Sequence, residues 1–143
     1  MSEDNNKAVV RRFAEECWGQ GDFDVADELV AEEVIRNGQP VGRRGLVGVI
    51  AAIRAAFPDF HTEVEDLVGE GDRVAWRYSS GGVHTGAPLL GIAAAGHAVN
   101  WTGTAIVRVE VGRIEEVWDN VDLFAIYTQL GVIAPPGSAA PVS

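Results

Sequence analysis

The stretch VNWTGTAIVRVEVGRIEEVWDNV, residues 99–121, decides the fold of this chain. It contains two long segments rich in β-branched and aromatic residues, Val99–Val109 and Arg113–Val121, which predict two strands. The short connection Glu110–Gly112 places a glycine where a compact hairpin needs a positive φ. This stretch therefore predicts a long antiparallel hairpin.

Further strands are predicted on the N-terminal side of the hairpin. Apolar and polar residues alternate over Phe60–Leu67, and Val74–Gly82 follows as the next strand after a glycine-rich turn. A longer loop, Thr85–Gly96, leads into the hairpin. Glu33–Asn37 is predicted as a short first strand.

Helices are predicted before this sheet and after it. The first helix has apolar residues at i, i+3, i+4, i+7 and i+8, which are Val10, Phe13, Ala14, Cys17 and Trp18. A short second helix follows, a third covers Leu46–Phe57 and ends before Pro58, and Asp122–Leu130 predicts a closing helix. This order predicts an α+β fold, with helices packed on one face of an antiparallel sheet.

The totals fit one domain. With 143 residues the chain is long enough to bury a core, and we expect one domain over residues 1–133 with a disordered Ala/Pro-rich tail over 134–143. A formal charge of −10 disfavours nucleic acid and anionic membranes as partners. No apolar run could span a bilayer and no secretory signal is visible, so a soluble, cytoplasmic protein is expected. The single cysteine and three scattered histidines predict no disulfide and no metal site.

The last strand carries the strongest candidate for chemistry. Trp118, Asn120 and Asp122 share one face, because side chains alternate along a strand. If this face is the concave one, burial beside tryptophan would raise the pKa of Asp122 and make it a better general base. Asp122 could equally serve as the N-cap of the closing helix, and both roles are compatible.

Other candidates have similar alternative interpretations. Arg108 could pair with a carboxylate, steady an oxyanion or be an exposed charge at the rim. His84 could donate to a ligand or bond only to backbone. Asn37 could point into a pocket or cap a turn. The tryptophans and Tyr78 either fill the core or line a ligand pocket, the strand tryptophans being Trp76, Trp101 and Trp118.

Several strings in this order resemble one family. They are FPDF (57–60), GDRVAWRYSSGGVHTG (71–86), GIAAAGHAVNWTG (91–103), GRIEEVWDNVD (112–122) and QLG (129–131). Together they resemble the SnoaL-like polyketide cyclase or ester cyclase family, within the nuclear-transport-factor-two-like superfamily, from the first helix to Gly131.

This resemblance implies a cone-shaped α+β fold around an apolar pocket, a homodimer, a small hydrophobic substrate and no metal or organic cofactor. It also implies intramolecular aldol chemistry, in which an aspartate, by position similar to Asp122, acts as acid and base. His84 matches the histidine of the family's G-T-H-x-G pattern, although Val83 replaces the threonine. Arg108 stands where characterised cyclases carry a partner histidine, and Asn37 stands where many members carry another.

Three functions remain open at this point. A cyclase-type enzyme is favoured by the resemblance. An epoxide hydrolase on this fold would need an aspartate two residues after an arginine, but Ser79 follows Arg77, and an isomerase would need a tyrosine that the first helix lacks. A non-catalytic ligand carrier or dimeric interaction module is the third, because a fold does not determine function.

Overall fold

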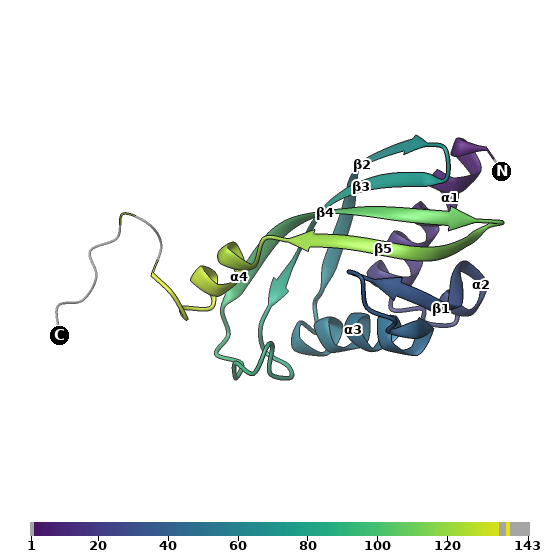
Figure 1. The fold of residues 1–143 in the computed structure, drawn as a ribbon. Coiled ribbons are helices and arrows are strands. Elements are labelled where there is room, and N and C mark those ends of the chain that lie inside the picture. Colours follow the sequence, from purple (N-terminus) through teal and green to yellow (C-terminus); the bar gives the residue numbers. More distant parts are fainter. Residues whose placement is uncertain (1, 135–136, 138–143) are drawn as a thin grey trace.

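The computed structural model describes residues 2–134 and 137, and within them five strands form one curved, open sheet (Figure 1). The elements in chain order are α1 (Glu3–Arg12), η1 (Phe13–Gly19), α2 (Val25–Leu29), β1 (Val30–Arg36), α3 (Gly42–Ala56), β2 (His61–Glu70), β3 (Arg73–Val83), β4 (Ala98–Glu110), β5 (Arg113–Val121) and α4 (Leu123–Gln129). The α+β fold predicted from the sequence is confirmed. Residues 135–136 and 138–143 of the predicted tail lie outside the described part.

The strand order is β1-β5-β4-β3-β2, so the predicted hairpin β4–β5 occupies the middle of the sheet. Its two-residue turn places both Val111 (φ 48°) and Gly112 (φ 76°) in the left-handed region. β2, β3, β4 and β5 pair antiparallel, whereas β1 pairs with β5 in parallel. This parallel pair departs from the predicted arrangement, because β1 joins the edge of the sheet through α3 and not through a hairpin.

The first predicted helix is divided into two kinds of helix. α1 is a regular α-helix, and η1 continues it as a π-helix. Four of the five residues of the predicted apolar stripe are buried, namely Val10, Phe13, Ala14 and Cys17, and the fifth, Trp18, is half-buried against the core. Burial raises the pKa of the Cys17 thiol to about 11, so this cysteine stays protonated and unreactive.

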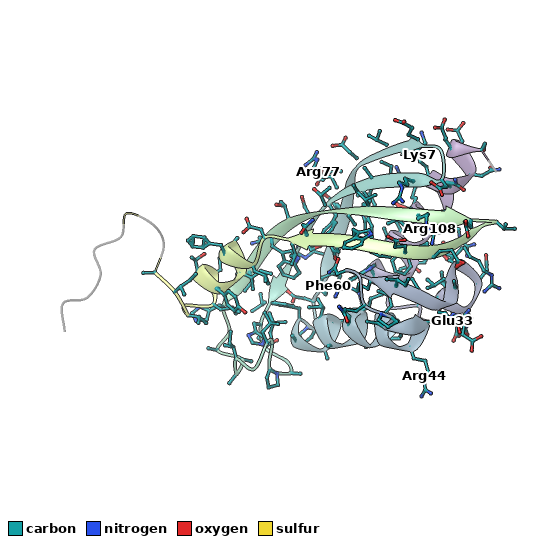
Figure 2. The ribbon with its side chains drawn as sticks, in the orientation of Figure 1. Lys7, Glu33, Arg44, Phe60, Arg77 and Arg108 are labelled. Carbon is teal, nitrogen blue, oxygen red and sulfur yellow. The ribbon has the colours of Figure 1, made fainter. Side chains whose placement is uncertain are left out.

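The helices α1, α2 and α3 cover one face of the sheet, and α4 extends past the end of β5 (Figure 1). On β3 and β4 every second residue is buried against these helices, as the alternation of a half-covered strand requires. Phe60 lies in this layer, between the sheet and α3 (Figure 2). The apolar core therefore fills the concave side of the sheet.

A bulge in β5 decides which side chains enter that concave side. Val109 pairs with Ile114, but Arg108 pairs with Glu116, so one extra residue is inserted at Glu115. Ile114 and Val117 are both buried, although simple alternation would place residues three apart on opposite faces. After the bulge the odd-numbered residues of β5 face the helices.

Candidate functional site

An apolar cavity of about 510 Å³ lies between the concave face of the sheet and α3. This volume is in the range of small-molecule sites. Its apolar walls come from η1, α3, the sheet, the loop after β3 and α4, through Trp18, Val49, Ile53, Phe57, Phe60, Trp76, Leu89, Leu90, Trp101, Val121, Leu123 and Ile126. The cavity is suited to a flat, largely hydrophobic ligand.

One carboxylate enters this cavity, and it belongs to Asp119. Val117 and Val121 flank it on the same face of β5, because side chains two residues apart share a face after the bulge. The side chain is only 13% exposed. Burial raises the pKa of the Asp119 carboxyl above its ordinary value, although the hydrogen bond from Tyr78 and the charge of Arg36 both act to lower it.

Tyr78 is the hydrogen-bond donor to this carboxylate. Its hydroxyl donates to Asp119 Oδ1 at 2.8 Å across the cavity wall. Burial and the neighbouring Asp119 raise the pKa of Tyr78, so it remains a protonated donor in the working range of a protein. The ring lies over Gly103 of β4, where an added Cβ would be 2.2 Å from the Tyr78 hydroxyl oxygen. A glycine at this position therefore makes room for the Tyr78–Asp119 hydrogen bond.

Arg36 and Asn37, at the end of β1, complete the polar part of the cavity. Arg36 places Nη2 at 3.8 Å from Asp119 Oδ2. Asn37 Oδ1 accepts a hydrogen bond from the Asp119 backbone N–H at 2.8 Å, and its own backbone N–H donates to Val117 O at 2.8 Å. The parallel β1–β5 pairing thus brings a cation and an amide beside Asp119.

The structure separates the residues predicted to bind substrate into two groups. One group lines the cavity: Asn37, Trp76, Tyr78, Trp101 and Asn120. The other group lies on the opposite, convex face of the sheet, where Trp118 is 44% exposed and Arg108 forms ion pairs with Glu116 at 3.3 Å and Glu110 at 3.2 Å. Arg108 is only 23% exposed and pairs with carboxylates on this face, while a role in steadying an oxyanion stays a prediction.

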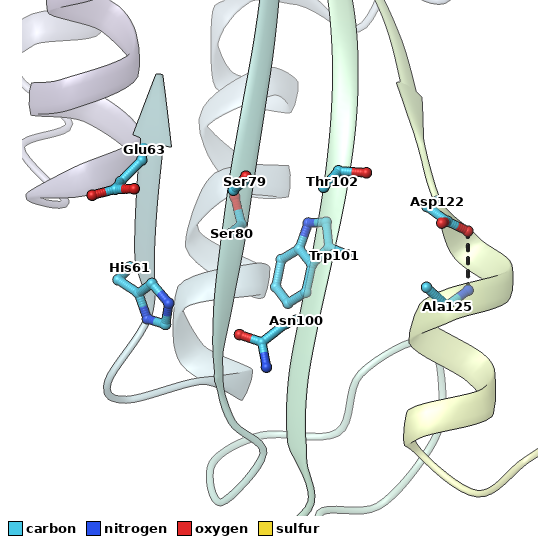
Figure 3. A pocket seen from close by; sticks show the side chains of 9 residues that line it. All are labelled: His61, Glu63, Ser79, Ser80, Asn100, Trp101, Thr102, Asp122 and Ala125. Atoms are coloured by element: carbon cyan, nitrogen blue, oxygen red, sulfur yellow. Dashed lines mark hydrogen bonds between the residues drawn. The ribbon is translucent and has the colours of Figure 1, made fainter. Parts of the chain in front are cut away.

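Asp122 lies outside the apolar cavity. Its Oδ1 accepts a hydrogen bond from the Ala125 backbone N–H at 3.0 Å, so it is the N-cap of α4 (Figure 3). It faces a second hollow of about 360 Å³ on the convex face, together with His61, Asn100 and Thr102 (Figure 3). The capping role predicted for Asp122 is observed, while its role as a base stays a prediction.

His84 is fully buried at the start of the loop after β3. Its Nε2 lies 2.9 Å from Ala87 O, its backbone N–H donates to His97 O, and its carbonyl accepts from Gly96 N. His84 is not among the cavity-lining residues. These contacts fit the interpretation that His84 bonds to backbone and holds the loop that carries Leu89 and Leu90 over the cavity.

Asp119 and Arg36 were not among the residues predicted for the site. The signal for Asp119 was present, because Val117, Asp119 and Val121 make a more apolar face than Trp118, Asn120 and Asp122. Among the described residues no group of three or more His, Cys, Asp or Glu side chains could hold a metal ion. No helix in residues 2–134 is both long and apolar enough to cross a bilayer.

Comparison with known proteins identified a matching family and many similar structures. The family model for SnoaL-like polyketide cyclase matches residues 8–130, which confirms the resemblance found in the sequence. A search of curated proteins found no match.

Three solved structures illustrate the similarity. IdmH from Streptomyces antibioticus, for which a polyketide cyclase activity has been suggested, is 29% identical over 89% of this chain and 99% of its own, with a TM-score of 0.77. A SnoaL-like protein from Jannaschia sp. CCS1, with the same suggested activity, is 28% identical over 94% and 95%, with a TM-score of 0.81. TsrD from Streptomyces laurentii is 25% identical over 93% and 99%, with a TM-score of 0.84.

Proposed function

We propose, from the premise that this chain belongs to the SnoaL-like polyketide cyclase family, that it is an acid/base enzyme that closes a ring in a hydrophobic, carbonyl-rich small molecule. The observation that supports this most is the position of Asp119, a mostly buried carboxylate in an aromatic cavity of about 510 Å³. Burial raises its pKa, and a carboxylate with a raised pKa is a stronger base.

The proposed reaction is an intramolecular aldol ring closure with Asp119 as the acid and base. Asp119 removes a proton from a carbon beside a carbonyl group, and the resulting enolate carbon attacks a second carbonyl of the same molecule. The new C–C bond leaves an alkoxide, which takes the proton back from Asp119. One carboxyl group therefore suffices, and no histidine partner is required.

The cavity contributes by holding the substrate folded. Trp76, Trp101 and Phe60 provide flat apolar surfaces, so a flexible chain of ketones loses most of its freedom before the reaction begins. Tyr78 fixes the Asp119 carboxylate in one orientation through its hydrogen bond of 2.8 Å. These contributions raise the rate without any further titrating group.

The test compares Asp119, near the end of β5, with Asp122, which directly follows β5. Asp119→Asn and Asp122→Asn are each assayed for ring closure of a linear aromatic poly-β-ketone ester, and for binding of a polycyclic aromatic ketone by thermal shift. We expect Asp119→Asn to bind the ketone and lose ring closure, while Asp122→Asn loses about 0.5–2 kcal/mol of stability as a lost N-cap and keeps ring closure. The reverse result would assign the base to Asp122. Binding without ring closure in the wild type would favour a ligand carrier.

We further infer a homodimer, as the family resemblance implies, and a cytoplasmic location. The convex face of the sheet supports the dimer, because it exposes Trp118 and Ile106 on the central strands β5 and β4. Trp118→Glu should then convert the dimer to a monomer in sedimentation analysis. A wild type that sediments as a monomer would contradict this inference.

A further inference from the structure

The guanidinium group of Arg36 is an unused set of donors in the cavity. Its side chain is 25% exposed, and its nearest charged neighbour is Asp119, at 3.8 Å. That distance is too long for a hydrogen bond, and no side-chain hydrogen bond of Arg36 occurs among the described residues. Arginine keeps its charge at every working pH and carries five N–H donors. A permanent positive charge with free donors therefore lies beside Asp119.

Asn37 adds a second donor with a fixed orientation. Only the oxygen of a carboxamide can accept a hydrogen bond, so the bond from the Asp119 N–H identifies the accepting atom as Oδ1. The backbone N–H of Asn37 is also bound, to Val117 O. The Nδ2 amide is thus left over, and within residues 2–134 it makes no hydrogen bond although the side chain lines the cavity.

The Tyr78 hydroxyl is already occupied, because it donates to Asp119 Oδ1. Arg36 and Asn37 are the cavity-lining side chains that contact Asp119 and still have donors left for a ligand oxygen. Both side chains present N–H groups and positive or partial positive charge. Such a pair favours an oxygen atom that becomes negative during a reaction.

We propose that Arg36 and Asn37 form an oxyanion subsite, and that the substrate is a neutral, enolisable carbonyl compound whose carbonyl oxygen they bind. This inference rests on the proposed function. As the C–H bond breaks, its proton bonds to the Asp119 carboxylate. The C–H electron pair forms the C=C bond of the enolate, and the C=O π pair moves to the oxygen beside Arg36 and Asn37.

The charge of the site is unchanged in this step. Before it, Arg36 is paired with the Asp119 carboxylate; after it, Arg36 is paired with the enolate oxygen. A substrate that is already anionic would compete with Asp119 for Arg36 and gain nothing from the proton transfer. The subsite therefore selects neutral ketones or 1,3-dicarbonyl compounds over carboxylates.

The experiment measures the ionisation of bound naphthol, whose oxygen imitates an enolate when it loses its proton. Naphthol is titrated by its own fluorescence, excited beyond the tryptophan absorption, in the full chain carrying Asp119→Asn. In that background we expect the pKa of bound naphthol to be lower than in water. Adding Arg36→Met should lower the ionisation constant of bound naphthol at least about tenfold, which raises its pKa by about one unit. Asn37→Asp should also raise the pKa of bound naphthol. This change keeps an oxygen to accept the backbone N–H of residue 119 but removes the two amide donors.

Two further variants complete the design. Arg44→Met removes the same charge from the exposed side of α3, away from the cavity (Figure 2), and should leave the naphthol pKa unchanged. Arg36→Lys keeps the charge if Arg36→Met fails to fold, and should keep part of the effect.

The inference is overturned if Arg36→Met changes the naphthol pKa by no more than Arg44→Met does, or if naphthol does not bind. The proposed function fails separately, because it requires Asp119→Asn to lose ring closure and the naphthol titration is made without turnover.

Discussion

Replacing Tyr78 by phenylalanine should destabilise the protein more at neutral pH than at low pH. The change removes one oxygen atom, and with it the 2.8 Å hydrogen bond from the hydroxyl to Asp119 Oδ1. A hydrogen bond to an ionised group contributes about 1.5–3 kcal/mol, whereas a bond to a neutral group contributes about 0.5–1.5 kcal/mol. We therefore expect a loss of about 2 kcal/mol when Asp119 is ionised and about 1 kcal/mol when it is protonated.

The direction of the pH dependence follows from the pKa of Asp119. Burial raises it above the ordinary value of 3.8, so the folded chain holds this proton more tightly than the unfolded chain does. The stability that this group contributes is therefore full below 3.8 and is lost as pH rises through the folded-state pKa. The Tyr78 bond opposes the raised pKa, so Tyr78→Phe should raise the Asp119 pKa further. The total stability lost between low and neutral pH should therefore be larger in this variant.

Urea unfolding between about pH 4 and about pH 8 measures this difference. Tyr127→Phe is the matched control, because its hydroxyl on α4 makes no hydrogen bond with the described residues and its effect should not depend on pH. An equal loss for Tyr78→Phe at both ends of the pH range, or no loss at all, would refute a charge-assisted bond between Tyr78 and Asp119.

Three other variants test separate parts of the structure. Gly103→Ala places a Cβ 2.2 Å from the Tyr78 hydroxyl oxygen, so it should lower the free energy of unfolding by about 1–3 kcal/mol and slow ring closure. Normal stability in thermal melting would contradict this close approach. His84→Ala leaves Ala87 O without its partner, so it should lower the free energy of unfolding by about 1–3 kcal/mol and make the loop after β3 sensitive to limited proteolysis. A variant that loses turnover while this loop stays protected would support the predicted catalytic role of His84. Val111→Asn should stabilise the hairpin turn by about 1 kcal/mol in urea unfolding, because asparagine tolerates the φ of 48° better than valine does; an unchanged midpoint would argue that the turn is unstrained.

The sequence predicted the scaffold well because its signals are local. The β4–β5 hairpin follows from strand composition around a glycine turn, and the apolar stripe of the first helix follows from its spacing. The parallel position of β1 beside β5 was not predictable in the same way. It depends on where α3 returns the chain, which is a tertiary contact.

The candidate site was predicted only in part, and the reason is the bulge at Glu115. Alternation divides β5 into two faces but does not say which face is concave. The tryptophan at position 118 favoured the even-numbered residues, yet Trp118 is 44% exposed and Asp119 enters the cavity. Arg36 was missed because its partner Asp119 lies on a strand that is distant in sequence.

The most direct test of the central claim is the exchange of a carbon-bound proton for deuterium in a simple ketone. Acetylnaphthalene is incubated with the protein in deuterium oxide, and the loss of its methyl signal is followed by NMR across pH. We predict exchange above background, with a rate that rises with pH through a pKa above 3.8, and an at least about hundredfold loss in Asp119→Asn but not in Asp122→Asn. Exchange that survives Asp119→Asn and disappears in Asp122→Asn would contradict the account.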